Sequence, residues 1–198
     1  MSSPITDSPV TTVLLCGVGG QGAITAAHLL ASAAMTDGYD VKVSEIHGMA
    51  QRGGSVVTTV RFGSQVSSMV CDAAQADVLI SFELLEAVRN LGYLAPNGHA
   101  VVNDVTIQPM PVLSGLATMP QNLHEALGSL GEAAVTCIDA DAIALEAGNR
   151  RCANVALLGS AAKHLPISEA SWRKAIEGRV PPKTLEANLR AFSASFGK

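Results

Sequence analysis

The sequence predicts an α/β fold in which a mostly parallel, Rossmann-like sheet is flanked by helices. Aromatic residues make up only 4% of a chain that is 48% apolar. The core is therefore expected to consist of Ala, Val, Leu and Ile, as in proteins with buried parallel strands. Apolar runs typical of strands alternate with helical patterns, and a glycine-rich turn joins the first strand to the first helix.

The first three elements form a predicted βαβ unit. Residues 11–17 (TTVLLCG) are β-branched and apolar and end in glycine, which favours a buried strand. A helical pattern follows over 20–38, with Gly38 as its stop. The residues at helical spacing are Ile24, Ala27, His28, Ala31 and Met35. The strand predicted at 39–46 completes the unit, and we expect a right-handed parallel crossover.

The middle of the chain continues this alternation. Predicted strands cover 55–63, 64–70 (a short one beside its predecessor), 76–82, 98–104 after a PNG turn, and 133–139. Predicted helices cover 83–94, 121–131 and 140–148. Three prolines between 105 and 120 predict an irregular excursion there.

The last quarter is predicted to be helical. Helices are expected at 152–165, 168–180 and 183–197, separated by Pro166 and by Pro181–Pro182. They form a helical C-terminal extension over 150–198. We predict a single domain, 1–198, with residues 1–10 as a flexible N-terminus.

Composition excludes several classes of function. The net charge is −4 and no basic block is present, which argues against a nucleic-acid partner. The N-terminus lacks the features of a signal peptide, and no uncharged apolar stretch reaches membrane-spanning length, so a cytoplasmic protein without a membrane partner is expected. The four cysteines, Cys16, Cys71, Cys137 and Cys152, form no C-x-x-C motif. They predict reduced, mostly buried thiols and no metal or cluster site in this chain.

The segment GVGGQG carries the first candidate site. Its register is G-x-G-x-x-G between a strand and a helix, which is the context of a dinucleotide fingerprint. The candidate phosphate- or partner-contacting residues are Gly17, Gly19, Gly20, Gln21 and Gly22. Three interpretations stay open: a nucleotide site, a tight turn without ligand, and a turn that holds a phosphate from a ligand shared with another subunit.

The second candidate site is the connection EIHGMAQRGGSVV, residues 45–57. His47 and Arg52 are candidates for catalysis, as a proton carrier and as a carboxylate or phosphate ligand. Glu45 stands near the position of a ribose-binding acid, but we favour an ion pair with Arg52. The expected partner-facing residues are Glu45, Gly48, Met49, Gln51, Gly53 and Gly54.

Three segments together resemble one family. GVGGQGAITAAHLLASAA, KVSEIHGMAQRGGSVVTTVRFG and ADVLISFELLEAVR are similar to the gamma-type domain of the 2-oxoacid:ferredoxin oxidoreductases. RCANVALLGSAAKHL and LEANLRAF resemble the C-terminal helices of that family. Within that family, the segment SEIHGMAQRGGSV most resembles the small subunit of the indolepyruvate type. Where this chain has His47-Gly48 and Ala50-Gln51, members that act on pyruvate or 2-oxoglutarate carry Tyr-Gly and an acidic residue, respectively.

The resemblance implies a role as the non-cofactor-bearing subunit of an indolepyruvate (arylpyruvate) ferredoxin oxidoreductase. Such an enzyme converts an aryl 2-oxoacid to aryl-acetyl-CoA, with coenzyme A as co-substrate and ferredoxin as electron acceptor. Thiamine diphosphate, Mg and [4Fe-4S] clusters are expected in a larger alpha subunit, which ferredoxin also meets, and none is expected in this chain alone. A homo-oligomer stays open. The alternative is a stand-alone nicotinamide- or flavin-binding oxidoreductase that uses the Gly17–Gly22 turn.

Overall fold

One six-stranded sheet organises the chain. The computed structural model describes residues 8–47, 53–131 and 134–196, and its strands lie in the order β2-β3-β1-β4-β5-β6. The strands are β1 (Thr11–Val18), β2 (Asp40–His47), β3 (Ser55–Gly63), β4 (Ala76–Ser81), β5 (Leu94–Asn103) and β6 (Val135–Ile138). The pairs β1–β4, β4–β5 and β5–β6 are parallel, whereas β3 is antiparallel to both β1 and β2. The predicted α/β class with a mostly parallel sheet is confirmed.

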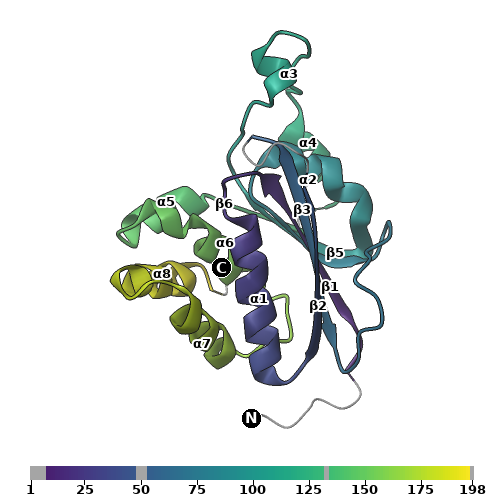
Figure 1. The fold of residues 1–198 in the computed structure, drawn as a ribbon. Helices are drawn as coiled ribbons and strands as arrows, with labels where there is room; N and C mark the ends of the chain where they lie inside the picture. Colours follow the sequence, from purple (N-terminus) through teal and green to yellow (C-terminus); the bar gives the residue numbers. More distant parts are fainter. Residues whose placement is uncertain (1–7, 48–52, 132–133, 197–198) are drawn as a thin grey trace.

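Helices cover both faces of the sheet (Figure 1). α1 and α6 pack on one face with α7 and α8 behind them, and α2 and α4 pack on the other. The helices are α1 (Ala23–Asp37), α2 (Leu84–Asn90), α3 (Met110–Leu113), α4 (Leu123–Gly128), α5 (Ala140–Glu146), α6 (Ala153–Ala162), α7 (Glu169–Arg179) and α8 (Pro182–Ser195). The 3₁₀ turn η1 (Leu91–Tyr93) precedes β5, and the 3₁₀ turn η3 (Arg150–Cys152) precedes α6.

The C-terminal helices belong to the main core. α6 contacts β4 and β5 directly, and α8 packs on α6. Trp172 of α7 and Phe192 of α8 are fully buried, with ring centroids 5.9 Å apart. Gly159 allows α8 to approach α6 closely, because a Cβ at this position would lie 2.5 Å from the Phe192 carbonyl oxygen. The helical extension expected from sequence therefore completes one layer of the fold.

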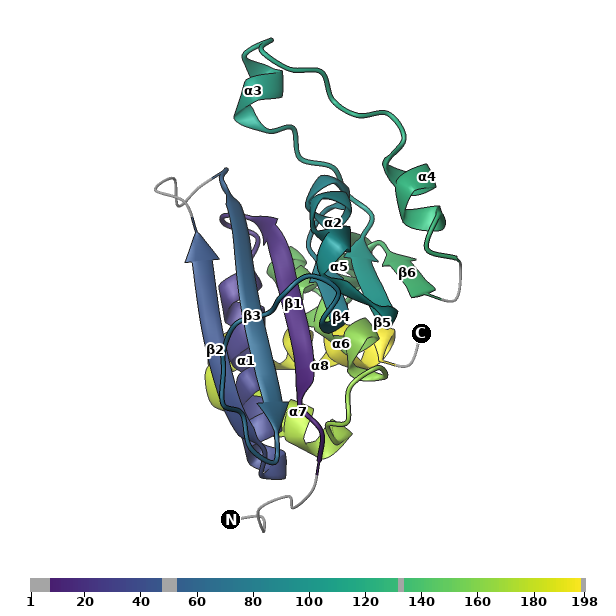
Figure 2. The ribbon, with the colours of Figure 1, turned by 90° about the vertical axis from the view of Figure 1, so that its right-hand side faces the viewer.

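The order of the first three strands departs from a simple βαβ unit. β2 runs in the same direction as β1, but β3 lies between them (Figure 2). The connection from β2 to β3 spans only residues 48–54, and a parallel crossover needs about a dozen residues. The chain therefore returns antiparallel and inserts β3 beside β1.

Two local predictions are wrong. Residues 64–70 form no strand, and two of their carbonyls, those of Ser68 and Val70, accept hydrogen bonds from the Arg61 guanidinium at 3.1 and 2.9 Å. The PNG segment forms no turn but lies inside β5, beside a register shift between Ala76 and Val78 in β4.

The predicted helix stops are confirmed. Gly38 adopts φ 97° and ends α1, and its N–H donates to the Met35 carbonyl oxygen at 3.1 Å. Gly148 adopts φ 99° after α5. Left-handed backbone of this kind favours glycine at a helix C-terminus.

The cysteines are free thiols. Cys16 and Cys152 are buried, Cys71 is half-buried and Cys137 is exposed. Burial raises the pKa of Cys16 to about 12, so this thiol stays protonated at neutral pH. Its position in the core on β1 gives it a packing role.

Candidate functional site

The glycine turn leaves the carboxyl end of β1 and leads directly into α1. Gly20 and Gly22 adopt left-handed backbone, with φ 108° and 87°. Gln21 lies between them, and its Oε1 accepts a hydrogen bond from the Val18 N–H at 2.8 Å. The side chain thereby closes the turn on itself and holds the start of α1 against the end of β1.

Gln21 also ties the turn to the neighbouring parallel strand. Its Nε2 donates to the Phe82 carbonyl oxygen at 2.8 Å, in the connection from β4 to α2. α1 lies on one face of the sheet and α2 on the other, so the chain leaves β1 and β4 in opposite directions. Such a switch between adjacent strands is where doubly wound sheets bind ligands. Gln21 spans this switch point.

Three glycines of this turn, Gly17, Gly20 and Gly22, have different structural reasons. A Cβ at Gly17 would lie 2.8 Å from the Phe82 Cβ, so close packing of the two connections requires glycine. At Gly20 nothing lies within 4 Å, and only the positive φ requires it. At Gly22 a Cβ would meet the Asn154 Nδ2 at 2.9 Å, in addition to the positive φ. Close packing and tight turning thus account for the turn without a ligand and leave its surface open to one.

The glycine pair after the β2–β3 connection lies against this turn. The Gly19 N–H donates to the Gly54 carbonyl oxygen at 2.8 Å, and the Gly53 N–H donates to the Gly19 carbonyl oxygen at 3.3 Å. These bonds extend the β1–β3 ladder beyond its last paired residues, Val18 and Ser55. The described glycine pair of the second candidate site, Gly53–Gly54, is therefore continuous with the backbone surface of the glycine turn.

The rest of the connection is only partly described. Gly48, Met49, Gln51 and Arg52 lie outside the described residues, as does any pairing of Arg52 with Glu45. The backbone of His47 ends β2 and pairs with Val56 of β3.

Glu45 is placed on the α1 side of β2. Its Oε1 lies 3.3 Å from the His28 Nε2 of α1. Because β3 separates β2 from β1, Glu45 is two strands away from the glycine turn. A ribose-binding acid is expected beside the turn, at the end of the adjacent strand. This displacement weakens the dinucleotide interpretation.

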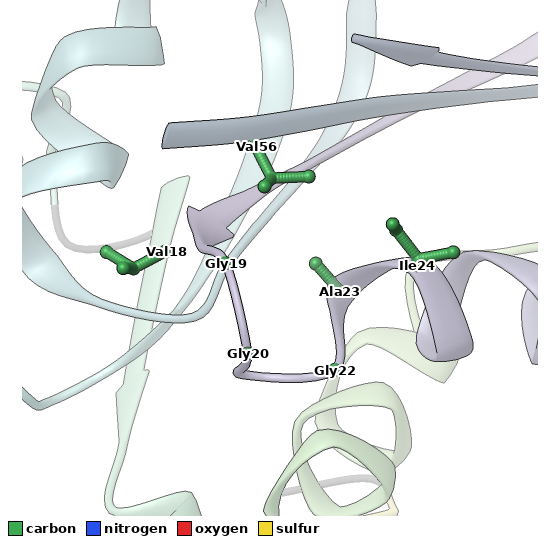
Figure 3. Close-up of a pocket in the computed structure, with 7 residues that line it drawn as sticks. All are labelled: Val18, Gly19, Gly20, Gly22, Ala23, Ile24 and Val56. Carbon is green, nitrogen blue, oxygen red and sulfur yellow. The ribbon is translucent and has the colours of Figure 1, made fainter. Parts of the chain in front are cut away.

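Three cavities surround the glycine turn, and each has a different character. The first, about 350 Å³, is apolar and combines the glycine backbone with Val18, Ala23, Ile24 and Val56 (Figure 3). The second has a similar volume and lies between Gly53–Gly54 and α2.

The third cavity, about 520 Å³, is the most polar. Its lining includes Gly20, Gly22, Thr25, Asn103, Asp141, Arg150, Arg151 and Asn154. Arg150 lies 3.5 Å from Asp141, and both arginines are exposed. Two guanidinium groups beside the N-terminus of α1 favour an anionic ligand. Sequence reasoning did not single out these arginines as site residues, because nothing in the local pattern predicts that α6 begins beside the turn.

Two buried carboxylates line the second cavity and were missed in the sequence. Glu83 is the N-cap of α2 and accepts from the backbone N–H groups of Leu85 and Glu86. Burial raises its pKa, and these hydrogen bonds oppose that rise. Glu86 accepts from the Ser55 hydroxyl at 2.5 Å and from the Arg89 guanidinium at 2.6 Å. Glu83 therefore caps α2, and Glu86 ties α2 to the start of β3 beside Gly53–Gly54.

Within residues 8–47, 53–131 and 134–196, no group of three His, Cys, Asp or Glu side chains could hold a metal ion. In the same part of the chain, no helix has the length and hydropathy needed to cross a membrane.

Comparison with known proteins decides the family. Residues 12–197 match the family described as pyruvate ferredoxin/flavodoxin oxidoreductase. The chain belongs to this family. The similarity to gamma-type domains expected from GVGGQG and HGMAQRGG is confirmed, and so is the character of an oxidoreductase subunit.

Members of the pyruvate ferredoxin/flavodoxin oxidoreductase family align along nearly the whole chain. The indolepyruvate oxidoreductase subunit IorB of Thermococcus kodakarensis is 43% identical over 185 residues, with 91% of each chain covered. The pyruvate/ketoisovalerate oxidoreductases common subunit gamma of Pyrococcus furiosus is 30% identical, covering 92% of this chain and 93% of its own. The solved pyruvate oxidoreductase subunit PORC of Thermotoga maritima shares the fold, with a TM-score of 0.71, 23% identity and 96% of both chains covered.

Proposed function

We propose that this chain is the non-cofactor-bearing subunit of an indolepyruvate, or more broadly arylpyruvate, ferredoxin oxidoreductase located in the cytoplasm. The observation that carries the proposal is the 43% identity with the indolepyruvate oxidoreductase subunit over 91% of both chains. The assembled enzyme would decarboxylate an aryl 2-oxoacid oxidatively to aryl-acetyl-CoA and pass the electrons to ferredoxin.

In this proposal, thiamine diphosphate, Mg and [4Fe-4S] clusters are held by a larger alpha subunit, which also meets ferredoxin. The donor set of this chain supports that division. Cys16 and Cys152 are buried in the core, and no described group of side chains has the composition of a metal site. Cluster ligation needs four converging thiolates.

The contribution of this chain is the surface formed by the glycine turn and Gly53–Gly54. Placed over the partner's active site, this surface would exclude water and present backbone N–H groups, Arg52 and His47 to the reactants. The polar cavity beside it, with Arg150 and Arg151, suits the phosphates of coenzyme A, which is the anionic co-substrate of the proposed reaction.

Selection of the 2-oxoacid is assigned mainly to the partner. The Pyrococcus furiosus relative is by name a subunit common to pyruvate and ketoisovalerate oxidoreductases. One gamma subunit shared by two enzymes cannot by itself distinguish their substrates. We extend this division of roles to the present chain.

The alternative, a stand-alone nicotinamide or flavin oxidoreductase, has less support. Its motif is present, but β3 separates Glu45 from the turn, and the Glu45 carboxylate lies 3.3 Å from His28. Titration with NADH, NADPH and flavin tests it directly. Micromolar binding together with turnover by the isolated chain would establish the alternative and refute the proposal.

The proposal is tested by reconstitution. The chain is co-expressed with the larger thiamine- and cluster-containing subunit, and indolepyruvate-dependent ferredoxin reduction is measured with and without it. We expect coenzyme A-dependent activity only in the complex. Arg52→Ala should lower the activity of the complex while the circular dichroism and the melting temperature of the chain stay unchanged. Unchanged activity would show that the charge of Arg52 is incidental.

A further inference from the structure

An extended segment rises from the carboxyl edge of the sheet between β5 and α4. We call residues 105–120 the arm. Figures 1 and 2 show it projecting beyond the sheet, with α3 near its tip. Between Asp104 and Glu125 the sequence contains no Asp, Glu, Lys or Arg. A segment that projects into water without any charge is unusual, because surface segments normally carry charged side chains.

The outer part of the arm, residues 109–117, is shaped by hydrogen bonds within its own backbone. The N–H groups of Val112 and Leu113 donate to the Pro109 carbonyl oxygen at 2.9 and 3.1 Å. Those of Leu116 and Ala117 donate to the Pro111 carbonyl oxygen at 2.8 and 3.0 Å. The arm is therefore a preformed element, and binding to it requires little ordering of the backbone.

The root of the arm is fixed to α2. The Leu84 N–H donates to the Val105 carbonyl oxygen at 2.9 Å, and the Ile107 N–H lies 3.5 Å from a carboxylate oxygen of the N-cap residue Glu83. This carboxylate is fully buried. The arm thus projects from a rigid base.

The side chains on the arm are large, apolar and open to solvent. The exposed fractions are 36% for Ile107, 66% for Met110, 62% for Leu113 and 85% for Leu116. Clustered exposure of this kind marks an interaction surface, since isolated monomers rarely leave such patches uncovered.

The arm is continuous with the glycine surface. Pro109, Met110 and Pro111 line the same cavity as Gly53 and Gly54. A protein that covers the glycine pair must therefore also meet the arm at Pro109–Pro111. We propose that the arm inserts into an apolar groove of the larger, cofactor-bearing subunit and clasps it over the glycine surface; this rests on the proposed function.

Two other occupants are less consistent with the arm. A membrane surface attracts segments that combine apolar side chains with Lys or Arg, and the arm has no cation. A second copy of this chain would cover the arm without explaining why it shares a cavity with Gly53–Gly54. Both are outcomes of the test below.

The test uses matched double variants in the full complex. Met110→Ser with Leu113→Ser removes two arm side chains that are 66% and 62% exposed. Met35→Ser with Leu145→Ser removes the same residue types at 64% and 67% exposure, from α1 and α5. Affinity for the larger subunit is measured by biolayer interferometry, and the mass of each isolated chain by light scattering.

We expect the arm variant to bind the larger subunit about 10- to 100-fold more weakly, because buried apolar anchors dominate such interfaces. The control variant should bind as the wild type does, and both should keep the wild-type melting temperature. Equal affinity of the wild type and the arm variant would overturn the inference. The inference would also be overturned if the wild type is a dimer that only the arm variant dissociates, while the affinity for the larger subunit stays unchanged. The same holds if the wild type binds phosphatidylglycerol vesicles and this binding requires the arm. If the wild type itself fails to bind the larger subunit, the proposed function fails.

Discussion

The substitution Gly22→Ala separates two costs that the structure assigns to one glycine. Gly22 has φ 87°, and an added Cβ would lie 2.9 Å from the Asn154 Nδ2. Left-handed backbone costs a non-glycine residue about 1–2 kcal/mol, and overpacking costs a further 1–3 kcal/mol or so. The free energy of unfolding should therefore fall by about 2–5 kcal/mol. For a chain of this size, each kcal/mol lowers the melting temperature by roughly 2–4 °C.

Gly20→Ala is the matched comparison. Gly20 has φ 108°, but nothing lies within 4 Å of the position of a Cβ. Only the backbone cost of about 1–2 kcal/mol should remain. Asn154→Ala introduced into Gly22→Ala should recover the packing part and bring that variant close to Gly20→Ala. Urea denaturation of Gly20→Ala, Gly22→Ala, Asn154→Ala and the double variant Gly22→Ala with Asn154→Ala, each against the wild type, measures this cycle. Equal destabilisation by Gly20→Ala and Gly22→Ala, with no recovery by Asn154→Ala, would refute the packing argument.

Two further predictions concern the turn and the pH dependence. Gln21→Leu removes the hydrogen bonds to Val18 and Phe82. Because each bond contributes about 0.5–1.5 kcal/mol, the free energy of unfolding measured by urea denaturation should fall by about 1–3 kcal/mol. A fall of less than about 0.5 kcal/mol would show that the bonds are not formed. Burial, and electrostatic repulsion from His99, whose ring stacks at 3.6 Å between centroids, and from Lys163, lower the pKa of His164 to about 4 from 6.5. Since the unfolded chain binds the proton more tightly, stability is complete above pH 6.5 and falls as the pH drops towards 4. His164→Phe should reduce this slope between pH 6.5 and 4, and an unchanged slope would contradict the assignment.

Strand positions were predictable where composition is distinctive. Residues 55–63, with five β-branched side chains among Val56, Val57, Thr58, Thr59 and Val60, form β3 with the predicted bounds. The antiparallel return before β3 was also within reach of the sequence, because the connection from β2 is too short for a parallel crossover. The strand predicted at 64–70 failed because tertiary hydrogen bonds from Arg61 outweigh a weak local pattern.

The candidate site was predictable only in part. The turn at Gly17–Gly22 and the glycine pair at 53–54 were both singled out as candidate site residues in the sequence, and the Gly19 hydrogen bonds place them in contact. Arg150, Arg151 and Asp141 could not be assigned to the same place from sequence. They lie more than a hundred residues away along the chain, and only the packing of α6 beside the turn brings them there. The roles of His47 and Arg52 stay predictions.

The bonds between Gly19 and Gly53–Gly54 have a consequence for how the family can diversify. They are made entirely by main-chain atoms, so they fix the alignment of the two segments whatever side chains the intervening residues carry. The residues that precede Gly53, where the sequence resemblance implies that pyruvate- and 2-oxoglutarate-type members differ, can therefore change without disturbing this main-chain alignment. In this respect β2, β3 and their connection resemble the framework of an antibody domain, which supports loops of variable sequence.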